Sequence, residues 1–97
     1  MRKHFDMESL PDNVAPYKQT PVFTEVTVPD GLRREHATKA GVWGLIHVES
    51  GRLRYEIAGA GGAVELSPDD PPGVIEPEVR HSVTPVGAVR FFVEFHR

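Results

Sequence analysis

The sequence contains no cysteine. Without thiols, neither a disulfide framework nor a thiolate metal cluster can form, and catalysis by a cysteine nucleophile is excluded. The chain also has no run of 18 apolar residues, and the basic residues at its start are not followed by the apolar stretch of a secretory signal. We therefore expect a soluble, cytoplasmic protein that does not act in a membrane.

The sequence also has no excess of positive charge. The formal net charge is −3, and the 11 lysines and arginines are scattered along the chain. Proteins that bind nucleic acid typically gather their cations on one stretch or one face. The charge pattern therefore argues against nucleic acid as a partner.

Long helical segments are absent, because nine prolines and nine glycines divide the 97 residues at short intervals. Between these breaks, apolar and polar residues alternate with period two, which is typical of half-buried strands. The alternation is clearest over residues 22–28 and 53–57. The predicted strands cover residues 21–28, 32–38, 42–49, 52–58, 63–66, 73–76, 80–84 and 88–96.

This number of short strands predicts one all-β domain over residues 17–97, closed as a β-barrel or jelly roll. Residues 1–16 are expected to form an N-terminal arm. Gly51 is predicted to form the turn of a hairpin, because glycine adopts positive φ at little cost. We expect a homodimer, in which the arm of one copy covers an edge strand of the other.

Two histidines stand on separate predicted strands. His36 ends the strand that precedes the predicted hairpin, and Thr38 lies on the same face. His81 follows the segment Gly73-Val74-Ile75-Glu76-Pro77. Two imidazoles on separate strands of a small barrel can converge on one pocket. This arrangement resembles the two cupin motifs, which implies a cupin-like β-barrel, also called a double-stranded β-helix.

A narrower resemblance covers residue 17 to the C-terminus. The segments that carry it, together with His81, are residues 17–23, 29–32, 36–44, 51–55, 74–77 and 90–95. They resemble the TehB/YeaR-like domain family, which includes a small domain of some tellurite-resistance methyltransferases and short proteins associated with nitrate or nitric-oxide response. The resemblance implies a role in tellurite resistance or in oxidative and nitrosative stress response. Nothing in the chain resembles the methyltransferase part.

Against the cupin pattern, Thr38 stands where a second histidine is usual, and Gly44 stands where a glutamate is usual. A non-haem iron site needs two histidines and a carboxylate, and catalytic zinc needs three protein ligands. A divalent zinc, iron, manganese or nickel ion bound by His36 and His81 would therefore need a carboxylate. Glu94 is the preferred third ligand and Glu76 the alternative, although the alternation around Glu94 also allows it to face solvent.

Thr38, Lys39 and Trp43 are expected to contact a bound small molecule or anion near the histidines. The prediction is thus a cupin-type domain that binds a metal ion or a small anionic ligand in its barrel pocket. The alternative is a non-catalytic dimeric interaction or ligand-sensing module, in which the histidines are structural. Enzymatic turnover stays open, because one barrel type supports many unrelated functions.

Overall fold

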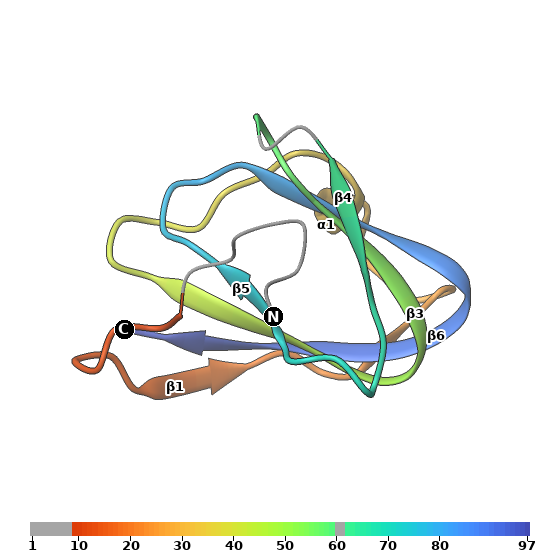
Figure 1. The fold of residues 1–97 in the computed structure, drawn as a ribbon, viewed down its shortest axis with the longest axis horizontal. Coiled ribbons are helices and arrows are strands. Elements are labelled where there is room, and N and C mark those ends of the chain that lie inside the picture. The colour runs from red at the N-terminus through yellow and green to blue at the C-terminus, as the bar shows by residue number, and fades with distance from the viewer. Residues whose placement is uncertain (1–8, 60–61) are drawn as a thin grey trace.

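A computed structural model of the chain describes residues 9–59 and 62–97 (Figure 1). The elements are β1 (Pro16–Gln19), β2 (Phe23–Thr24), α1 (Asp30–Arg33), β3 (Trp43–Ile57), β4 (Ala63–Leu66), β5 (Gly73–Ile75) and β6 (His81–His96). The all-β prediction is confirmed. Within the predicted strand over residues 32–38, the first two residues instead belong to α1, and only His36 and Thr38 form isolated bridges.

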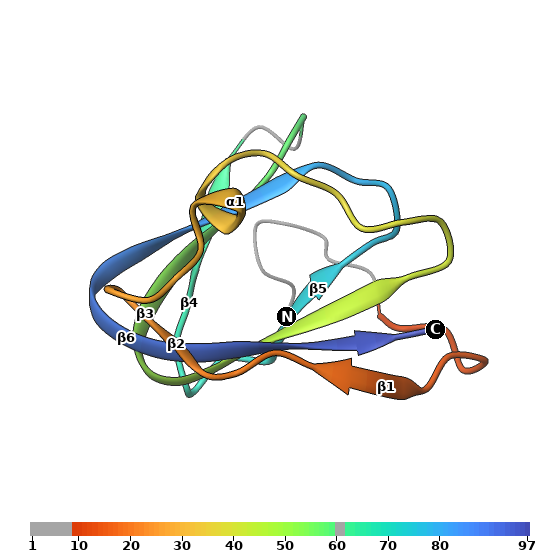
Figure 2. The same ribbon diagram turned by 180° about the vertical axis from the view of Figure 1, so that it is seen from behind.

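Two long strands organise the sheet. β3 and β6 pair antiparallel from Trp43 opposite His96 to Ile57 opposite His81. β1 and β2 add to β6, and β4 and β5 add to β3. Figures 1 and 2 show that the β3–β6 ribbon bends back over itself. Among the described residues no pairing joins β1 to β4, so the sheet is open and the predicted closed cupin barrel is not confirmed.

The bend coincides with two glycines that lie between predicted strands. Gly51 has φ +77° and Gly87 has φ +72°, and both lie inside strands, where the β3–β6 register shifts. A glycine at positive φ serves a β-bulge as well as a turn, and a bulge bends the strand that contains it. The predicted hairpin at Gly51 and the predicted strand break at Gly87 are therefore wrong.

Gly51 is also required by a close approach of the two strands. A Cβ atom at this position would collide with the backbone carbonyl oxygen of Ala88 on β6. Gly87 has open space at the corresponding point. The two glycines thus share a backbone conformation, but only Gly51 is also held by packing.

The hydrophobic core lies on the inner, concave side of the bent sheet. Its largest fully buried side chains are Tyr55, Phe91, Ile46, Leu53, Leu66 and Val89. The hydroxyl group of Tyr55 donates a hydrogen bond to the Val74 carbonyl oxygen at 2.8 Å. Burial raises the pKa of Tyr55 far above its usual range, with a smaller contribution from Glu76, so the phenol stays neutral.

The two ends of the described chain lie side by side. Ala15 and Arg97 exchange both backbone hydrogen bonds at 3.1 Å, which extends the pairing of β1 with β6. The end of the predicted arm is therefore part of the sheet edge, whereas residues 1–8 lie outside the described residues. The homodimer stays a prediction. In the described ranges, no helix has the length and apolar character needed to cross a membrane.

Candidate functional site

The candidate site is built around His36 and His81, which the fold brings into direct contact. His81 begins β6, and the loop before β3 runs antiparallel to it at His36. Each residue donates its backbone N–H to the carbonyl oxygen of the other, at 3.0 and 2.8 Å. The two imidazole rings lie 4.2 Å apart between centroids. The backbone pairing therefore fixes both side chains side by side.

Both rings are oriented by hydrogen bonds to a backbone carbonyl oxygen two residues earlier in the chain. The Nδ1 atom of His81 lies 3.1 Å from the Val79 carbonyl oxygen, and the Nδ1 atom of His36 lies 3.2 Å from the Arg34 carbonyl oxygen. A carbonyl oxygen can only accept, so these contacts assign the proton to Nδ1. In a neutral ring, Nε2 then presents a lone pair.

His81 is held neutral by its surroundings. Its side chain is almost fully buried, with 2% of the residue exposed. Burial lowers the pKa of His81, against a smaller opposing effect of the hydrogen bond to Val79, and the neighbouring His36 adds a still smaller lowering. The Nε2 atom of His81 is therefore an acceptor at neutral pH.

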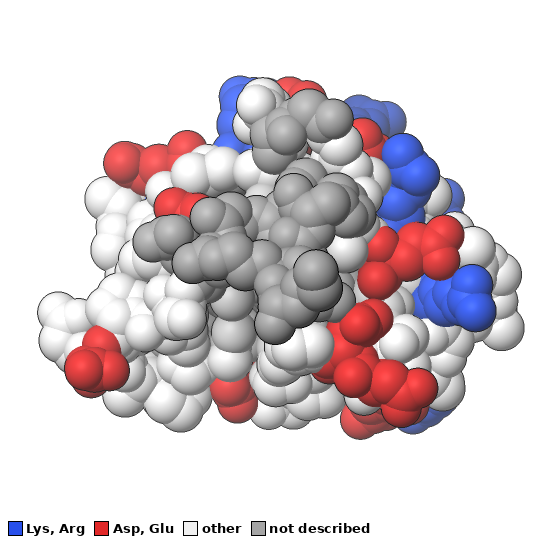
Figure 3. Space-filling view, in the orientation of Figure 1, with Lys and Arg blue, Asp and Glu red and all other residues white. Residues whose placement is uncertain are grey.

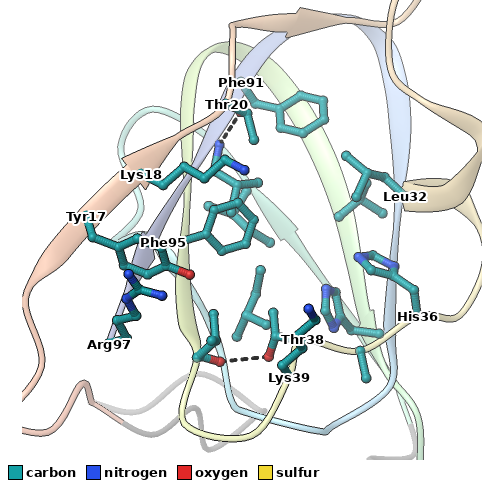
Figure 4. A pocket seen from close by; sticks show the side chains of 17 residues that line it. Tyr17, Lys18, Thr20, Leu32, His36, Thr38, Lys39, Phe91, Phe95 and Arg97 are labelled. Carbon is teal, nitrogen blue, oxygen red and sulfur yellow. Dashed lines mark hydrogen bonds between the residues drawn. The ribbon is translucent and has the colours of Figure 1, made fainter.

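Beside the histidines lies a cavity of about 550 Å³, shown in Figure 4 with its 17 lining residues. Nine of these residues have side chains made only of carbon and hydrogen: Leu32, Ala37, Val42, Ile46, Ile75, Val83, Phe91, Val93 and Phe95. Four of them come from alternate positions of β6, whose side chains point to the inner face. The lining is typical of a site for an organic molecule.

The two threonine hydroxyl groups in the pocket are used within the protein. Thr38 Oγ1 donates to the Val42 carbonyl oxygen at 2.7 Å, and the Val93 N–H donates to Thr20 Oγ1 at 3.0 Å (Figure 4). These bonds fix the loop before β3 and the segment after β1. The polar groups left for a ligand are the histidines and the side chains of Tyr17, Lys18, Lys39 and Arg97.

The structure brings together some of the predicted site residues and separates others. His36, Thr38, Lys39 and His81 line the pocket, whereas Glu94, Glu76 and Trp43 do not. Since side chains alternate along a strand, Glu94 points to the face opposite Val93 and Phe95. There its Oε1 atom accepts a hydrogen bond from His96 Nε2 at 2.9 Å and lies 3.7 Å from His47 Nε2.

The position of the usual cupin glutamate has no room for a side chain. A Cβ atom on Gly44 would lie 3.0 Å from Ile75 Cδ1 and 3.2 Å from Ile75 Cβ. Both distances are tighter than ordinary van der Waals contact, so Ile75 would have to shift by a few tenths of an ångström to admit a side chain here. The pocket is therefore lined by no aspartate or glutamate from the described part of the chain.

These positions overturn the predicted metal centre. Within residues 9–59 and 62–97, no group of three or more histidine, aspartate or glutamate side chains could hold a metal ion. The ligand set of His36, His81 and Glu94, with Glu76 as the alternative, is not assembled, because the carboxylates lie outside the pocket. The predicted zinc, iron, manganese or nickel cofactor is wrong.

Several residues that line the pocket were not predicted from the sequence. The alternation of Phe91, Val93 and Phe95 on the last strand was a usable sign of an inward face. Lys18 and Arg97 gave no such sign, because they stand near opposite ends of the sequence. Only the pairing of β1 with β6 brings these two cations to the same pocket.

Comparison with known proteins identifies the family. The family model of the TehB-like domain matches residues 18–93. The chain belongs to the TehB-like domain family. The resemblance seen in the sequence is therefore confirmed.

Similar full-length proteins are known from Haemophilus influenzae. In strains KW20 and 10810, proteins named probable S-adenosyl-L-methionine-dependent methyltransferase TehB are 34% identical to this chain over 71 residues. The match covers 69% of this chain and 25% of each relative. The chain thus spans about a quarter of the curated relatives it matches.

Two crystal structures share the fold. TehB from Haemophilus influenzae superposes with a TM-score of 0.81 and 24% identity, over 88% of this chain and 32% of that chain. A protein from E. coli strain K12 superposes with a TM-score of 0.82 and 22% identity, over 94% of this chain and 97% of that chain. At this level of identity, the likeness shows the fold alone.

The comparisons also correct the predicted function. The relatives are named methyltransferases and not metal-binding proteins, and the described residues gather no metal ligands. The predicted metal-binding cupin function is therefore wrong. A small anion between the two histidines is no better supported, because it would face the lone pair of neutral His81.

S-adenosylmethionine, the cofactor named for the relatives, does not fit these residues either. It carries a sulfonium cation and ribose hydroxyl groups, which nucleotide sites commonly meet with a carboxylate. The described lining of the pocket offers three cations and no carboxylate. The methyltransferase name thus applies to the relatives, of which this chain spans about a quarter.

Proposed function

We propose that this domain binds a small organic molecule with an apolar body, whose hydrogen-bond donor meets the Nε2 atoms of His36 and His81. The observation that carries the proposal is a carbon-lined cavity of about 550 Å³ with two oriented imidazoles in its wall. This volume lies within the roughly 300–1,000 Å³ typical of small-molecule sites.

The imidazoles favour a donor over an acceptor on the ligand. Each Nδ1 atom is used by a backbone carbonyl oxygen, and neither Nε2 atom has a hydrogen-bond partner in the described part of the chain. A ligand hydroxyl or N–H group in the pocket would satisfy such an acceptor. Because a net hydrogen bond contributes about 0.5–1.5 kcal/mol, the donor should raise affinity by roughly 2- to 12-fold.

The test uses two probes that differ only in this donor. Isothermal titration calorimetry of the full chain with 2-naphthol should show binding at one site, several-fold tighter than with 2-methoxynaphthalene. Val42→Trp should weaken both probes, because Val42 lines the pocket. The matched control is Leu45→Trp, in β3 three residues after Val42 and outside the pocket, which should bind as wild type. Absence of binding by both probes, or normal binding by folded Val42→Trp, would overturn the proposal.

A further inference from the structure

The cations of this protein fall into two groups. Four arginines each lie within ion-pair distance of a glutamate: Arg52 with Glu65 (3.5 Å), Arg54 with Glu56 (3.4 Å), Arg80 with Glu35 (3.3 Å) and Arg90 with Glu49 (3.7 Å). Figure 3 shows acidic and basic side chains next to one another on one half of the face it displays. The other five cations of the described residues have no carboxylate partner there: Lys18, Arg33, Arg34, Lys39 and Arg97.

Three of these five, Lys18, Lys39 and Arg97, line the pocket, although they come from distant parts of the sequence. Lys18 belongs to β1, Arg97 follows β6, and Lys39 lies in the loop before β3. Figure 4 shows Lys18 and Arg97 on one side of the pocket and Lys39 beside Thr38. All three residues are exposed, so their charges stand where the pocket meets solvent.

Arg97 is further positioned by an aromatic ring. Its guanidinium carbon lies 4.0 Å from the centre of the Tyr17 ring. A cation–π contact orients the guanidinium group but does not neutralise it. The pocket mouth therefore presents an oriented guanidinium group with no carboxylate partner among the described side chains.

From this distribution we infer that the ligand is an amphipathic organic acid, with its apolar body in the carbon-lined cavity and its carboxylate or sulfonate at Lys18, Lys39 and Arg97. The inference rests on the proposed function and names the class of ligand. The negative group goes to the mouth and not to the histidines, because the cations there have no other counter-ion in the described chain. Several cations around one anion also attract it before contact.

The experiment compares an acid with its neutral counterpart on the full chain. In calorimetry, 2-naphthoate should bind about tenfold more tightly than 2-naphthamide at low salt, and the advantage should shrink at about 0.5 M salt, because salt screens exposed charges. The double variant Lys18→Met/Lys39→Met should lose about tenfold for 2-naphthoate and less than about twofold for 2-naphthamide.

A matched control removes the same amount of charge elsewhere. Arg52→Met/Arg54→Met lies outside the pocket and should leave both affinities within about twofold of wild type. Equal affinity of acid and amide for the wild type, or an equal loss of both in the lysine variant, would overturn the inference but leave the proposed function standing. If neither 2-naphthoate nor 2-naphthamide binds to the wild type, the proposed function and this inference both fail.

Discussion

Two histidine pairs with different chemistry lie on opposite sides of the β3–β6 ribbon. On the inner face, His36 and His81 meet beside the pocket without a carboxylate. On the outer face, His47 and His96 both lie near Glu94. Residues adjacent in sequence point to opposite faces, so the carboxylate that a metal site needs lies with the wrong pair. The comparison shows why a pair of histidines in one pocket does not make a metal centre.

Side-chain contacts position the outer pair, whereas hydrogen bonds to the backbone position the inner pair. The His47 ring stacks on Phe92, with 4.8 Å between ring centres and 19° between planes. His96 donates its Nε2 proton to Glu94. The inner rings use Nδ1 for backbone carbonyl oxygens, and both residues line the pocket. We therefore assign stabilisation to the outer pair and ligand binding to the inner pair.

The largest effect on stability is expected for substitutions at the two glycines in the bend of the β3–β6 ribbon. Gly51→Ala should destabilise the fold by about 3 kcal/mol or more, because strain at positive φ adds to a collision with the Ala88 carbonyl oxygen. Gly87→Ala has the same φ strain but open space, so it should cost about 1–2 kcal/mol. Urea unfolding of both variants measures the difference. Equal destabilisation would show that close packing at Gly51 does not matter.

These glycines also mark the limit of what the sequence could predict. Period-two alternation located most of the strands, because half-burial leaves a direct trace in residue type. It could not show that residues 42–49 and 52–58 form one strand, since glycine at positive φ is common to turns and bulges. The distinction depends on which residues of β6 pair with Gly51, and pairing partners leave no local signal.

A smaller effect is expected for the outer pair. Glu94→Ala should lower the free energy of unfolding by about 1 kcal/mol, because buried His96 loses its hydrogen-bond acceptor. The control Glu56→Ala breaks only an exposed pair with Arg54 and should change stability by less than about 0.5 kcal/mol. Neither variant should alter the affinity for 2-naphthol. Weaker probe binding by Glu94→Ala would place this carboxylate functionally with the inner pair.

A gradual loss of stability with falling pH is expected from protonation of the inner pair. The pKa of His81 is lowered in the folded protein, so the unfolded chain binds its proton first as pH falls. The stability linked to neutral His81 is therefore present above the unfolded pKa of about 6.5 and is lost as pH falls towards the lowered folded pKa. Urea midpoints from roughly pH 8 to pH 5 should fall more steeply for wild type than for His81→Phe. Parallel curves would contradict a buried, neutral His81.

The candidate site was partly accessible from the sequence. Motif spacing indicated that His36 and His81 meet, because each lies at the start or end of a recognisable extended segment. The sequence did not decide which face Glu94 occupies. Alternation shows that neighbouring residues point to opposite faces, but not which of the two faces is the inner one. The cationic mouth could not be foreseen, because Lys18 and Arg97 become neighbours only through the pairing of β1 with β6. A site built from residues that are distant in the sequence can be located only once the fold is known.

The central claim is that the inner face binds an organic molecule and the outer face does not. Its most direct test is backbone amide NMR of the isotopically labelled full chain during titration with 2-naphthoate. We predict saturable shift changes at pocket residues such as Leu32, Val83 and Phe91, with little change at the outer-face residues Arg54 and Glu65, which are exposed and away from the pocket. Saturable shifts at the outer-face residues, or no saturable shift at any residue, would contradict the claim.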